Sequence, residues 1–292
     1  MMTFPLKTVE NSVNMSVPKT LNSVRTEPSS ILIYGDPRTG KTILASTIAK
    51  SPKIQRVIWF DLERGLESVV HIKEPKHLIL TEEEKEKIVP INVRDGTAPG
   101  ETVAAETLLK FFSSKTPIKV DQDTGKVVAD GGMPLCFATL GADTAVVIDS
   151  GSQLSDSIIT LAGQEMKAEA GKGRSVDGRQ VYGRAAEHMT CIFTAIQSAP
   201  CYVIMITHQF EVVEGFGDTL VKSYLPMFGS RNFLGRVGKY FGHIIYTHKT
   251  LGGLKWGSSI GFKSNALTGS RKGIALENMK EPTLVPFIRR ED

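Results

Sequence analysis

The chain contains one octet with the residue types and spacing of a phosphate-binding loop. Residues 35–42 read G-D-P-R-T-G-K-T and match the pattern G-x-x-x-x-G-K-[ST]. The glycines let the backbone approach phosphates closely, so that successive N–H groups surround their oxygens. Lys41 is expected to reach the β- and γ-phosphates, and Thr42 to offer its hydroxyl to Mg²⁺. We therefore predict that a nucleoside triphosphate binds to Gly35, Asp36, Pro37, Arg38, Thr39, Gly40, Lys41 and Thr42, with Mg²⁺ at Thr42; the octet alone does not identify the nucleotide as ATP.

Acidic residues follow two strand-like runs at places where a bound nucleotide would use them. Asp149 ends the most apolar run of the chain, and beside a phosphate loop such an Asp is expected to hold Mg²⁺. Hydrolysis also needs a group that positions or deprotonates a water, but the residue after Asp149 is Ser150. We expect Glu63 to be this catalytic acid, because the carboxyl ends of parallel strands meet at one edge of a sheet. Glu67 and Asp61 are the alternatives.

These side chains require a sheet that brings several strand ends together. Strand-like runs cover residues 31–34, 56–63, 88–95, 144–150 and 201–209, and residues with helical spacing lie between them. The alternation predicts an α/β fold with a mostly parallel central sheet flanked by helices. We expect an N-terminal arm (residues 1–28) and one domain (residues 29–292). A small hairpin is expected within an insertion at about residues 95–143.

The acids and one further motif resemble those of the RecA-like ATPase cores. Those proteins place a catalytic Glu after the second strand, as Glu63 is placed here, and follow the metal-binding Asp with Ser, as in VVIDSGSQL. The run MITHQ is similar to a third motif of these proteins. In that motif a polar residue, usually Gln, ends a strand that lies between the strand of the phosphate loop and the strand of the metal-binding Asp. The resemblance implies a RecA-like P-loop fold and a residue, Gln209, that touches the γ-phosphate, with His208 as its neighbour.

A narrower resemblance concerns compact phage-encoded ATPases, some of which act as single-strand annealing recombinases. The run YLPMFGSRNFLGRVGKYFGHIIY is similar to their substrate loop and the strand that follows it. This resemblance implies an ATPase that binds single-stranded DNA in recombination or replication, by annealing or strand exchange. Its location would be cytoplasmic, in the host if the chain is phage-encoded.

Two segments are expected to be loops that hold the DNA, as the corresponding loops of RecA-like proteins do. Cations would follow the phosphates and aromatic rings would stack on bases. The first loop, at about residues 162–180, carries Lys167, Lys172, Arg174 and Arg179, although Glu165, Glu169 and Asp177 lower its net charge. The second, at about residues 210–239, carries Lys222, Arg231, Arg236 and Lys239 with Phe216, Tyr224, Phe228 and Phe233.

The class of ATPase also implies a homo-oligomer, either a ring or a filament. In such assemblies a basic residue of one subunit completes the nucleotide site of the next. Arg271 is the candidate for this role, together with Lys272, and the alternatives are Lys249 and Lys263. The sequence does not choose between them.

Composition excludes several other classes. The 292 residues are 41% hydrophobic and 23% charged with a net charge of +4, which is ordinary for a globular protein and permits a polyanionic partner without requiring one. No apolar run approaches the length of a membrane span, and no membrane partner is expected. The three cysteines and six histidines show no metal-binding spacing.

Two other functions remain open. The chain could be a nucleotide-switched assembly or loading factor that acts on a protein partner, for example one of replication or recombination. It could also be a helicase-type motor, which is less favoured because no primase or helicase-linker region is visible in the sequence.

Overall fold

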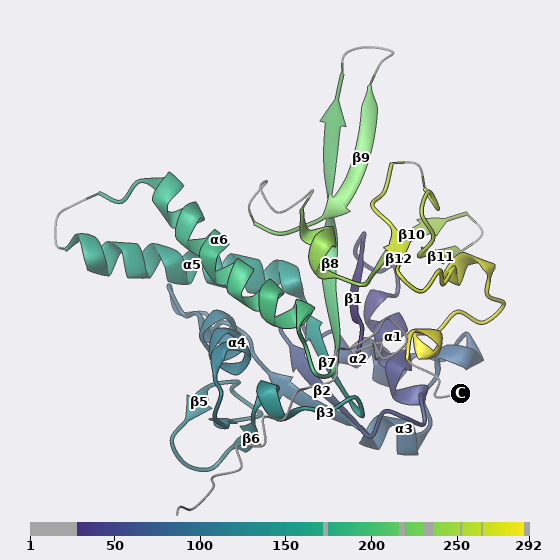
Figure 1. Cartoon of the computed structure of the whole chain (residues 1–292), viewed down its shortest axis with the longest axis horizontal. Coiled ribbons are helices and arrows are strands. Elements are labelled where there is room, and N and C mark those ends of the chain that lie inside the picture. The colour runs from purple at the N-terminus through teal and green to yellow at the C-terminus, as the bar shows by residue number, and fades with distance from the viewer. Residues whose placement is uncertain are drawn as a thin grey trace, which may run out of the picture.

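A mostly parallel sheet forms the central layer of the molecule (Figure 1). The structure is a computed structural model that describes residues 28–171, 175–215, 220–229, 236–251, 253–263 and 265–288. Within them, nine strands form one sheet with the order β11-β10-β1-β8-β7-β2-β3, while β9 pairs with β8 and β12 with β10. The strands are β1 (Ser30–Gly35), β2 (Arg56–Asp61), β3 (Ile88–Asn92), β7 (Thr144–Asp149), β8 (Tyr202–Glu214), β9 (Val221–Pro226), β10 (His243–Thr250), β11 (Gly253–Gly257) and β12 (Gly269–Ser270).

The order of the strands brings the predicted site residues to one edge. Strands β10, β1, β8, β7, β2 and β3 are parallel neighbours, so their carboxyl ends lie on the same side. Strand β8 lies between β1, which enters the phosphate loop, and β7, which ends at Asp149. This confirms the α/β fold with a mostly parallel sheet.

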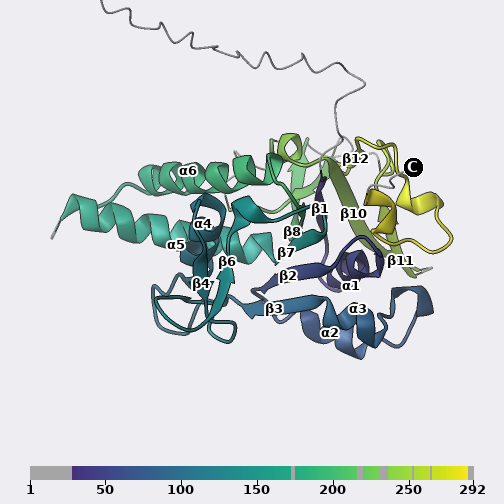
Figure 2. The ribbon, with the colours of Figure 1, turned by 60° about the horizontal axis from the view of Figure 1, so that its bottom comes forward.

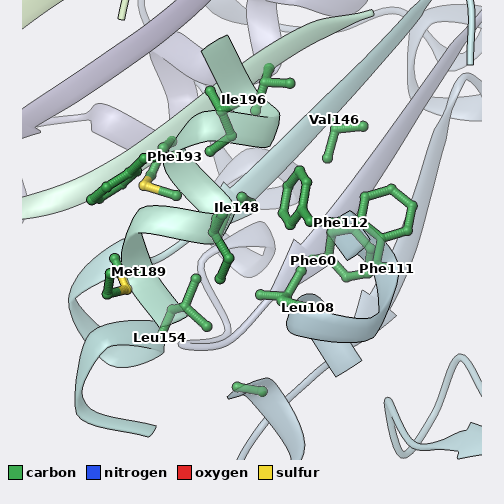
Figure 3. Packing of buried hydrophobic residues seen from close by; sticks show 14 of the residues in the cluster. Phe60, Leu108, Phe111, Phe112, Val146, Ile148, Leu154, Met189, Phe193 and Ile196 are labelled. Carbon is green, nitrogen blue, oxygen red and sulfur yellow. The ribbon is translucent and has the colours of Figure 1, made fainter. Parts of the chain in front are cut away.

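Helices cover both faces of this sheet. They are α1 (Lys41–Ser46), α2 (Leu66–His71), α3 (Glu82–Glu86), α4 (Val103–Ser113), α5 (Gly151–Ala170) and α6 (Gly178–Gln197). Alternate residues of each strand point to opposite faces, because the side-chain period of a strand is two. One face packs against α1 and α2 through Ile33, Trp59 and Val147. The other packs against α4, α5 and α6, where Phe60, Ile148 and Phe193 belong to one buried cluster (Figure 3).

The predicted insertion carries a small second sheet. Strands β4 (Ile118–Val120), β5 (Val127–Val128) and β6 (Met133–Leu135) pair antiparallel in the order β5-β4-β6. The helix of the insertion, α4, buries Leu108, Phe111 and Phe112 against the main sheet. The expected hairpin is therefore present, and its helix belongs to the core of the domain.

The described residues of the two segments expected to be loops belong largely to helices and strands instead. Most of residues 162–180 belongs to α5 and to the start of α6, which run side by side away from the sheet (Figures 1 and 2). Arg184 of α6 joins them through ion pairs with Glu165 and Glu169 of α5. Glycine and charged residues suggested a loop, but these ion pairs and the buried Ala162 favour helix.

The described residues of the second segment up to Pro226 belong to a β-hairpin. Strand β8 does not end at Gln209 but continues to Glu214, and β9 returns antiparallel beside it, from Glu214↔Val221 to Gln209↔Pro226. This β8–β9 hairpin projects from the body of the domain (Figure 1). The predicted arm lies outside the described residues except for Pro28. None of the described helices is long and apolar enough to cross a membrane.

Candidate active site

The predicted phosphate loop connects β1 to α1. Asp36, Pro37 and Arg38 are exposed, whereas Thr39 and Lys41 are buried. Lys41 Nζ donates to the carbonyl oxygens of Gly35 (3.1 Å) and Asp36 (2.6 Å), so the ammonium already lies within the loop. Burial lowers the pKa of Lys41 to about 8, although the negative charges of Asp149 and Glu63 oppose this shift.

Two strands near the C-terminus, β10 and β11, contact the phosphate loop and support it. The sequence did not indicate these contacts. Thr247 of β10 faces Gly35, and a Cβ at Gly35 would lie 2.0 Å from the carbonyl oxygen of Thr247. The hydroxyl of Thr247 also bonds that of Thr39 at 2.6 Å, and Trp256 Nε1 of β11 donates to the Thr39 carbonyl at 3.0 Å. Residues more than 200 positions away in the sequence thus hold the loop in place, and no local sequence pattern reveals such long-range contacts.

The two predicted Mg²⁺ residues are in contact. Thr42 Oγ1 donates to Asp149 Oδ2 at 2.9 Å. Burial raises the pKa of Asp149 to about 7, against the effect of this hydrogen bond. A hydroxyl and a buried carboxylate are hard oxygen donors of the kind Mg²⁺ prefers, and Mg²⁺ commonly takes its remaining ligands from phosphates and water. The pair therefore fits this ion, with Thr42 and Asp149 as the residues that would hold it.

The turn after β2 packs directly on this pair. Gly65 lies so close that a Cβ there would be 2.3 Å from Asp149 Oδ2 and 3.1 Å from Thr42 Oγ1. The turn is closed by Asp61, whose carboxylate accepts from the Gly65 N–H at 3.0 Å and contacts Arg94 at 3.4 Å. Sequence reasoning missed Gly65, since no motif distinguishes it from a glycine of an ordinary turn.

Glu63, the predicted catalytic acid, projects from the same turn. Its Oε1 accepts a short hydrogen bond from Ser150 Oγ, and its Oε2 lies 3.3 Å from His208 Nε2. The contact with His208 lowers the pKa of Glu63 most, and that with Ser150 adds to the effect. About a third of the Glu63 side chain remains exposed. Of the alternatives, Asp61 is buried in its contacts with Gly65 and Arg94, and Glu67 lies within α2.

Gln209 and His208 lie on opposite faces of the sheet. His208 belongs to the face of α1, in register with Gly35 of β1 and next to Glu63. Gln209 belongs to the other face, where its Oε1 accepts from the hydroxyl of Tyr246 at 2.9 Å. The γ-phosphate role of Gln209 stays a prediction, and His208 is the member of the pair that contacts Glu63, the predicted catalytic acid.

The candidates for a role in a neighbouring subunit are spread over the C-terminal part. Arg271 is exposed and lies near the start of β1. Its backbone N–H donates to the carbonyl oxygen of Gly242, and the backbone N–H of Gly242 donates to the carbonyl oxygen of Ser30 in β1. The six residues of β1 separate it from the phosphate loop by about 16 Å, so Arg271 does not belong to its own site. Lys272 donates to the Phe287 carbonyl at 2.6 Å.

The two alternative cations lie elsewhere. Lys249 is exposed near the carboxyl end of β10, on the side of the phosphate loop. Lys263 lies over the ring of Tyr224, 4.3 Å from its centroid.

The residues expected to contact DNA have mixed environments. Lys167, Arg179 and Arg236 are exposed, Lys222 pairs with Glu211 at 2.8 Å, and Lys239 lies over Tyr240. The prediction that Phe228 stacks on DNA bases is wrong, because its side chain is 2% exposed and packs edge-on against Phe193. Tyr224 stacks on Tyr246. Lys172, Arg174, Phe216, Arg231 and Phe233 lie outside the described residues.

Two solved structures are similar to this chain at low scores. An ATPase from the type III secretion system of pathogenic bacteria has a TM-score of 0.39 and 11% identity over 77% of this chain and 53% of its own. The chain thus spans about half the length of that ATPase. The RadB recombinase has a TM-score of 0.32 and 15% identity over 77% of each chain. The comparison with curated proteins found no significant match.

A family of known domains does match. The model of the family described as an AAA domain matches residues 27–234, which is more than half of the chain. The matched range includes the phosphate loop, Glu63, Asp149 and the β8–β9 hairpin. The chain therefore belongs to the family described as an AAA domain.

Proposed function

We propose that this protein is a Mg²⁺-dependent ATPase whose nucleotide state controls the binding of single-stranded DNA. The observation that carries the ATPase proposal is the convergence of Lys41, the Thr42–Asp149 pair and Glu63 at one edge of the sheet. A Mg²⁺ ion at Thr42 and Asp149 would neutralise charge on the β- and γ-phosphates.

The residues of the chain divide the hydrolysis step between them. Lys41 exchanges its two carbonyl partners for phosphate oxygens when ATP binds. Glu63 orients a water and accepts its proton as the water oxygen attacks the γ-phosphorus. The bond from that phosphorus to the bridging oxygen of ADP breaks, and ADP and phosphate leave.

The DNA part of the proposal rests on exposed cations and on the sequence resemblance. Lys167 and Arg179 lie on the α5–α6 projection, and Arg236 lies after the β8–β9 hairpin. Exposed cations of this kind neutralise phosphates without reading sequence. We infer a role in recombination or replication, of the phage annealing or strand-exchange type, with subunits joined in a ring or filament.

One observation favours a second function, in which the hairpin binds a protein. Its exposed side chains near the tip include Val213, Leu220 and Val221, each about half exposed. The charged residues of its described part are Glu211, Glu214 and Lys222, of which Glu211 and Lys222 neutralise each other. An aliphatic, slightly acidic ribbon suits a protein surface better than a phosphate backbone.

Fluorescence anisotropy of a labelled single-stranded oligonucleotide, measured with ATP, with ADP and at several salt concentrations, tests the proposal. We expect tighter binding with ATP than with ADP, and an affinity that falls steeply with salt. Arg236→Ala should flatten the salt dependence, whereas Arg56→Ala, an exposed Arg at the opposite edge of the sheet, should not. Absence of binding at low salt in every nucleotide state would refute the DNA proposal and favour the protein partner.

A further inference from the structure

Apart from glycines, the described residues with a left-handed backbone are two arginines. Arg38 has a φ of 61° and Arg64 a φ of 59°. This conformation is uncommon for residues other than glycine, asparagine and aspartate, because the Cβ atom crowds the backbone. Residues held in it collect at functional sites, where the surrounding structure imposes the conformation. The position of both arginines beside the proposed nucleotide site therefore points to a role for their side chains.

Arg38 belongs to the phosphate loop itself. The next residue, Thr39, is buried and donates to the carbonyl oxygen of Asp36 at 2.7 Å, and its hydroxyl also bonds that of Thr247. These bonds hold the loop on both sides of Arg38, whereas the Arg38 side chain is exposed. Because such a loop surrounds the α- and β-phosphates with its N–H groups, Arg38 carries its guanidinium group beside those phosphates.

Arg64 lies on the other side of the site, in the turn after β2. It stands between Glu63, the proposed catalytic acid, and Gly65, which packs on the Thr42–Asp149 pair. Consecutive Cα atoms are only about 3.8 Å apart. The long, exposed side chain of Arg64 therefore starts beside the place where the γ-phosphate is proposed to lie.

The backbone of this turn does not explain an arginine at position 64. A positive φ favours glycine, but the glycine of the turn is Gly65, whose φ is −62°. Gly65 is needed for a different reason, since a Cβ there would lie 2.3 Å from Asp149 Oδ2. A turn that served only to connect β2 to α2 would have its glycine one position earlier. The side chain of Arg64 is thus the feature that needs an explanation.

The charges around the proposed phosphate site are mainly negative without the two arginines. The ammonium group of Lys41 is within electrostatic reach of several carboxylates, those of Asp149, Glu63 and Asp36. Burial raises the pKa of Asp156 on α5, and the negative charge of Glu63 adds to the effect. ATP with its Mg²⁺ ion is itself an anion, so its binding at this edge is favoured by further positive charge.

Both arginines can supply this charge. Within the part of the chain that the structure describes, neither guanidinium group forms a hydrogen bond or an ion pair. A guanidinium group can donate two parallel hydrogen bonds to a phosphate, which makes arginine a stronger phosphate ligand than its charge alone would.

We infer that Arg38 and Arg64 contact the phosphates of the nucleotide from opposite sides of the site. Arg64 contacts the γ-phosphate, and Arg38 contacts the phosphates that ATP and ADP share. Arg64 is therefore the residue that makes the protein prefer ATP to ADP, while Arg38 strengthens the binding of both. This inference rests on the proposed ATPase function and adds two phosphate-contacting residues to it.

The first test is titration calorimetry with ADP and with a non-hydrolysable ATP analogue, both with Mg²⁺. Arg64→Ala should weaken binding of the analogue by about ten-fold or more and that of ADP by less than about two-fold, whereas Arg38→Ala should weaken both by about ten-fold. Arg64→Lys should lose less than Arg64→Ala, because lysine keeps the charge without the bidentate geometry. The matched control is Arg56→Ala, an exposed Arg at the amino end of β2, which should change neither affinity.

The second test separates the side chain from the backbone. Arg64→Gly and Arg64→Ala remove the same guanidinium group and should lose the same affinity for the analogue. Without nucleotide, however, the glycine variant should have a Tm about 2–4 °C above that of the alanine variant, because glycine adopts a positive φ freely. The same order is expected for Arg38→Gly and Arg38→Ala. At Arg56, which lies in a strand, the glycine variant should instead have the lower Tm.

Several results would overturn the inference. These are unchanged affinity in Arg38→Ala or Arg64→Ala, an equal loss of ADP and analogue binding in Arg64→Ala, and a Tm of the glycine variants at or below that of the alanine variants. Unchanged nucleotide affinity with weaker binding of a single-stranded oligonucleotide would assign the arginines to DNA instead. Failure of the unaltered protein to bind either nucleotide would contradict the proposed ATPase function, and this inference with it, before any substitution is compared.

Discussion

At the scale of single residues, the side chains of the proposed nucleotide site are held by contacts within the chain. Lys41 makes two hydrogen bonds to loop carbonyls, and Thr42 bonds Asp149. Buried polar groups must find partners, and the carbonyl oxygens of the loop satisfy Lys41. We expect bound ATP to replace these hydrogen bonds of Lys41 with bonds to its phosphate oxygens.

Gly65 gives the most specific prediction at this scale. Gly65→Ala places a methyl group 2.3 Å from Asp149 Oδ2, and the Thr42–Asp149 pair must separate. We expect the Mg²⁺-dependent part of ATP affinity to fall about ten-fold or more, with the fold retained. Gly183→Ala is the matched control, because a Cβ added at Gly183 would meet no atom within 4 Å apart from its chain neighbours and the backbone of its own helix. Titration calorimetry with and without Mg²⁺ measures the ATP affinity of both variants. An equal Mg²⁺ dependence in the two would contradict the assignment of Thr42 and Asp149 as the Mg²⁺ residues.

The sequence predicted Lys41, Thr42, Asp149 and Glu63 because each has a motif or a strand end that marks it. Gly65 and Thr247 have no such mark, since their importance comes from contacts across the sheet. The choice between His208 and Gln209 depends on which face of β8 each occupies. The face that each residue occupies follows from the register of β8 with β1, and a single sequence does not reveal this register.

At the scale of elements, the strands of the central sheet were predictable and the two projections were not. Apolar runs such as residues 144–149 predict buried strands, because a strand that is covered on both faces is apolar at nearly every position. Helix α5 and the outer part of β8 are partly exposed, and their polar and charged residues resemble those of a surface loop. Pairing with α6 and β9 decides their structure, and such pairing is not local.

Phe228 shows how this error changes a prediction. As a loop aromatic it would stack on DNA bases, but it is buried against Phe193. Phe228→Ala should lower the free energy of unfolding by about 3–5 kcal/mol, the usual cost of emptying a core Phe site. Denaturant unfolding followed by circular dichroism measures this. A change below about 1 kcal/mol would place the side chain outside the core.

The start of β10 gives a prediction about pH. Burial lowers the pKa of His243 to about 4, and the charges of Lys272 and Arg271 add to the effect. The unfolded chain therefore binds a proton at higher pH than the folded protein, so stability falls as the pH drops through the range from about 6.5 to 4. The loss amounts to about 2 kcal/mol between pH 7 and pH 5.

The matched variant for this effect is His243→Asn, which does not titrate and can keep the hydrogen bond that His243 Nδ1 makes with Ser270. Unfolding free energies at pH 7 and pH 5 should differ less in this variant than in the unaltered protein, by about the stated amount. An identical acid sensitivity would show that His243 is not buried as described.

At the scale of the whole molecule, Arg271 lies at the edge of the sheet opposite its own phosphate loop. If subunits assemble head to tail, this edge of one copy can face the nucleotide of the next. We expect Arg271→Ala and Lys41→Ala each to be inactive alone. A one-to-one mixture should regain about a quarter of the normal turnover, because that share of random interfaces joins an intact loop to an intact Arg271.

The mixture must be formed under conditions that allow subunits to exchange, which size-exclusion chromatography of labelled copies verifies. Normal turnover by Arg271→Ala, or no recovery after verified exchange, would remove Arg271 from the site. The same mixing experiment with Lys249→Ala then tests the exposed cation at the carboxyl end of β10.

The most direct test of the central claim is ATP hydrolysis by the purified protein, by Lys41→Ala and by Glu63→Gln, with analogue binding measured on the same samples. We predict Mg²⁺-dependent turnover by the unaltered protein. Lys41→Ala should lose nucleotide binding or hydrolysis, while Glu63→Gln should bind the analogue and lose turnover by about 100-fold or more. Normal hydrolysis by folded Lys41→Ala would contradict the assignment of the loop. Normal hydrolysis by Glu63→Gln, with loss in Glu67→Gln, would show that the other acid is catalytic.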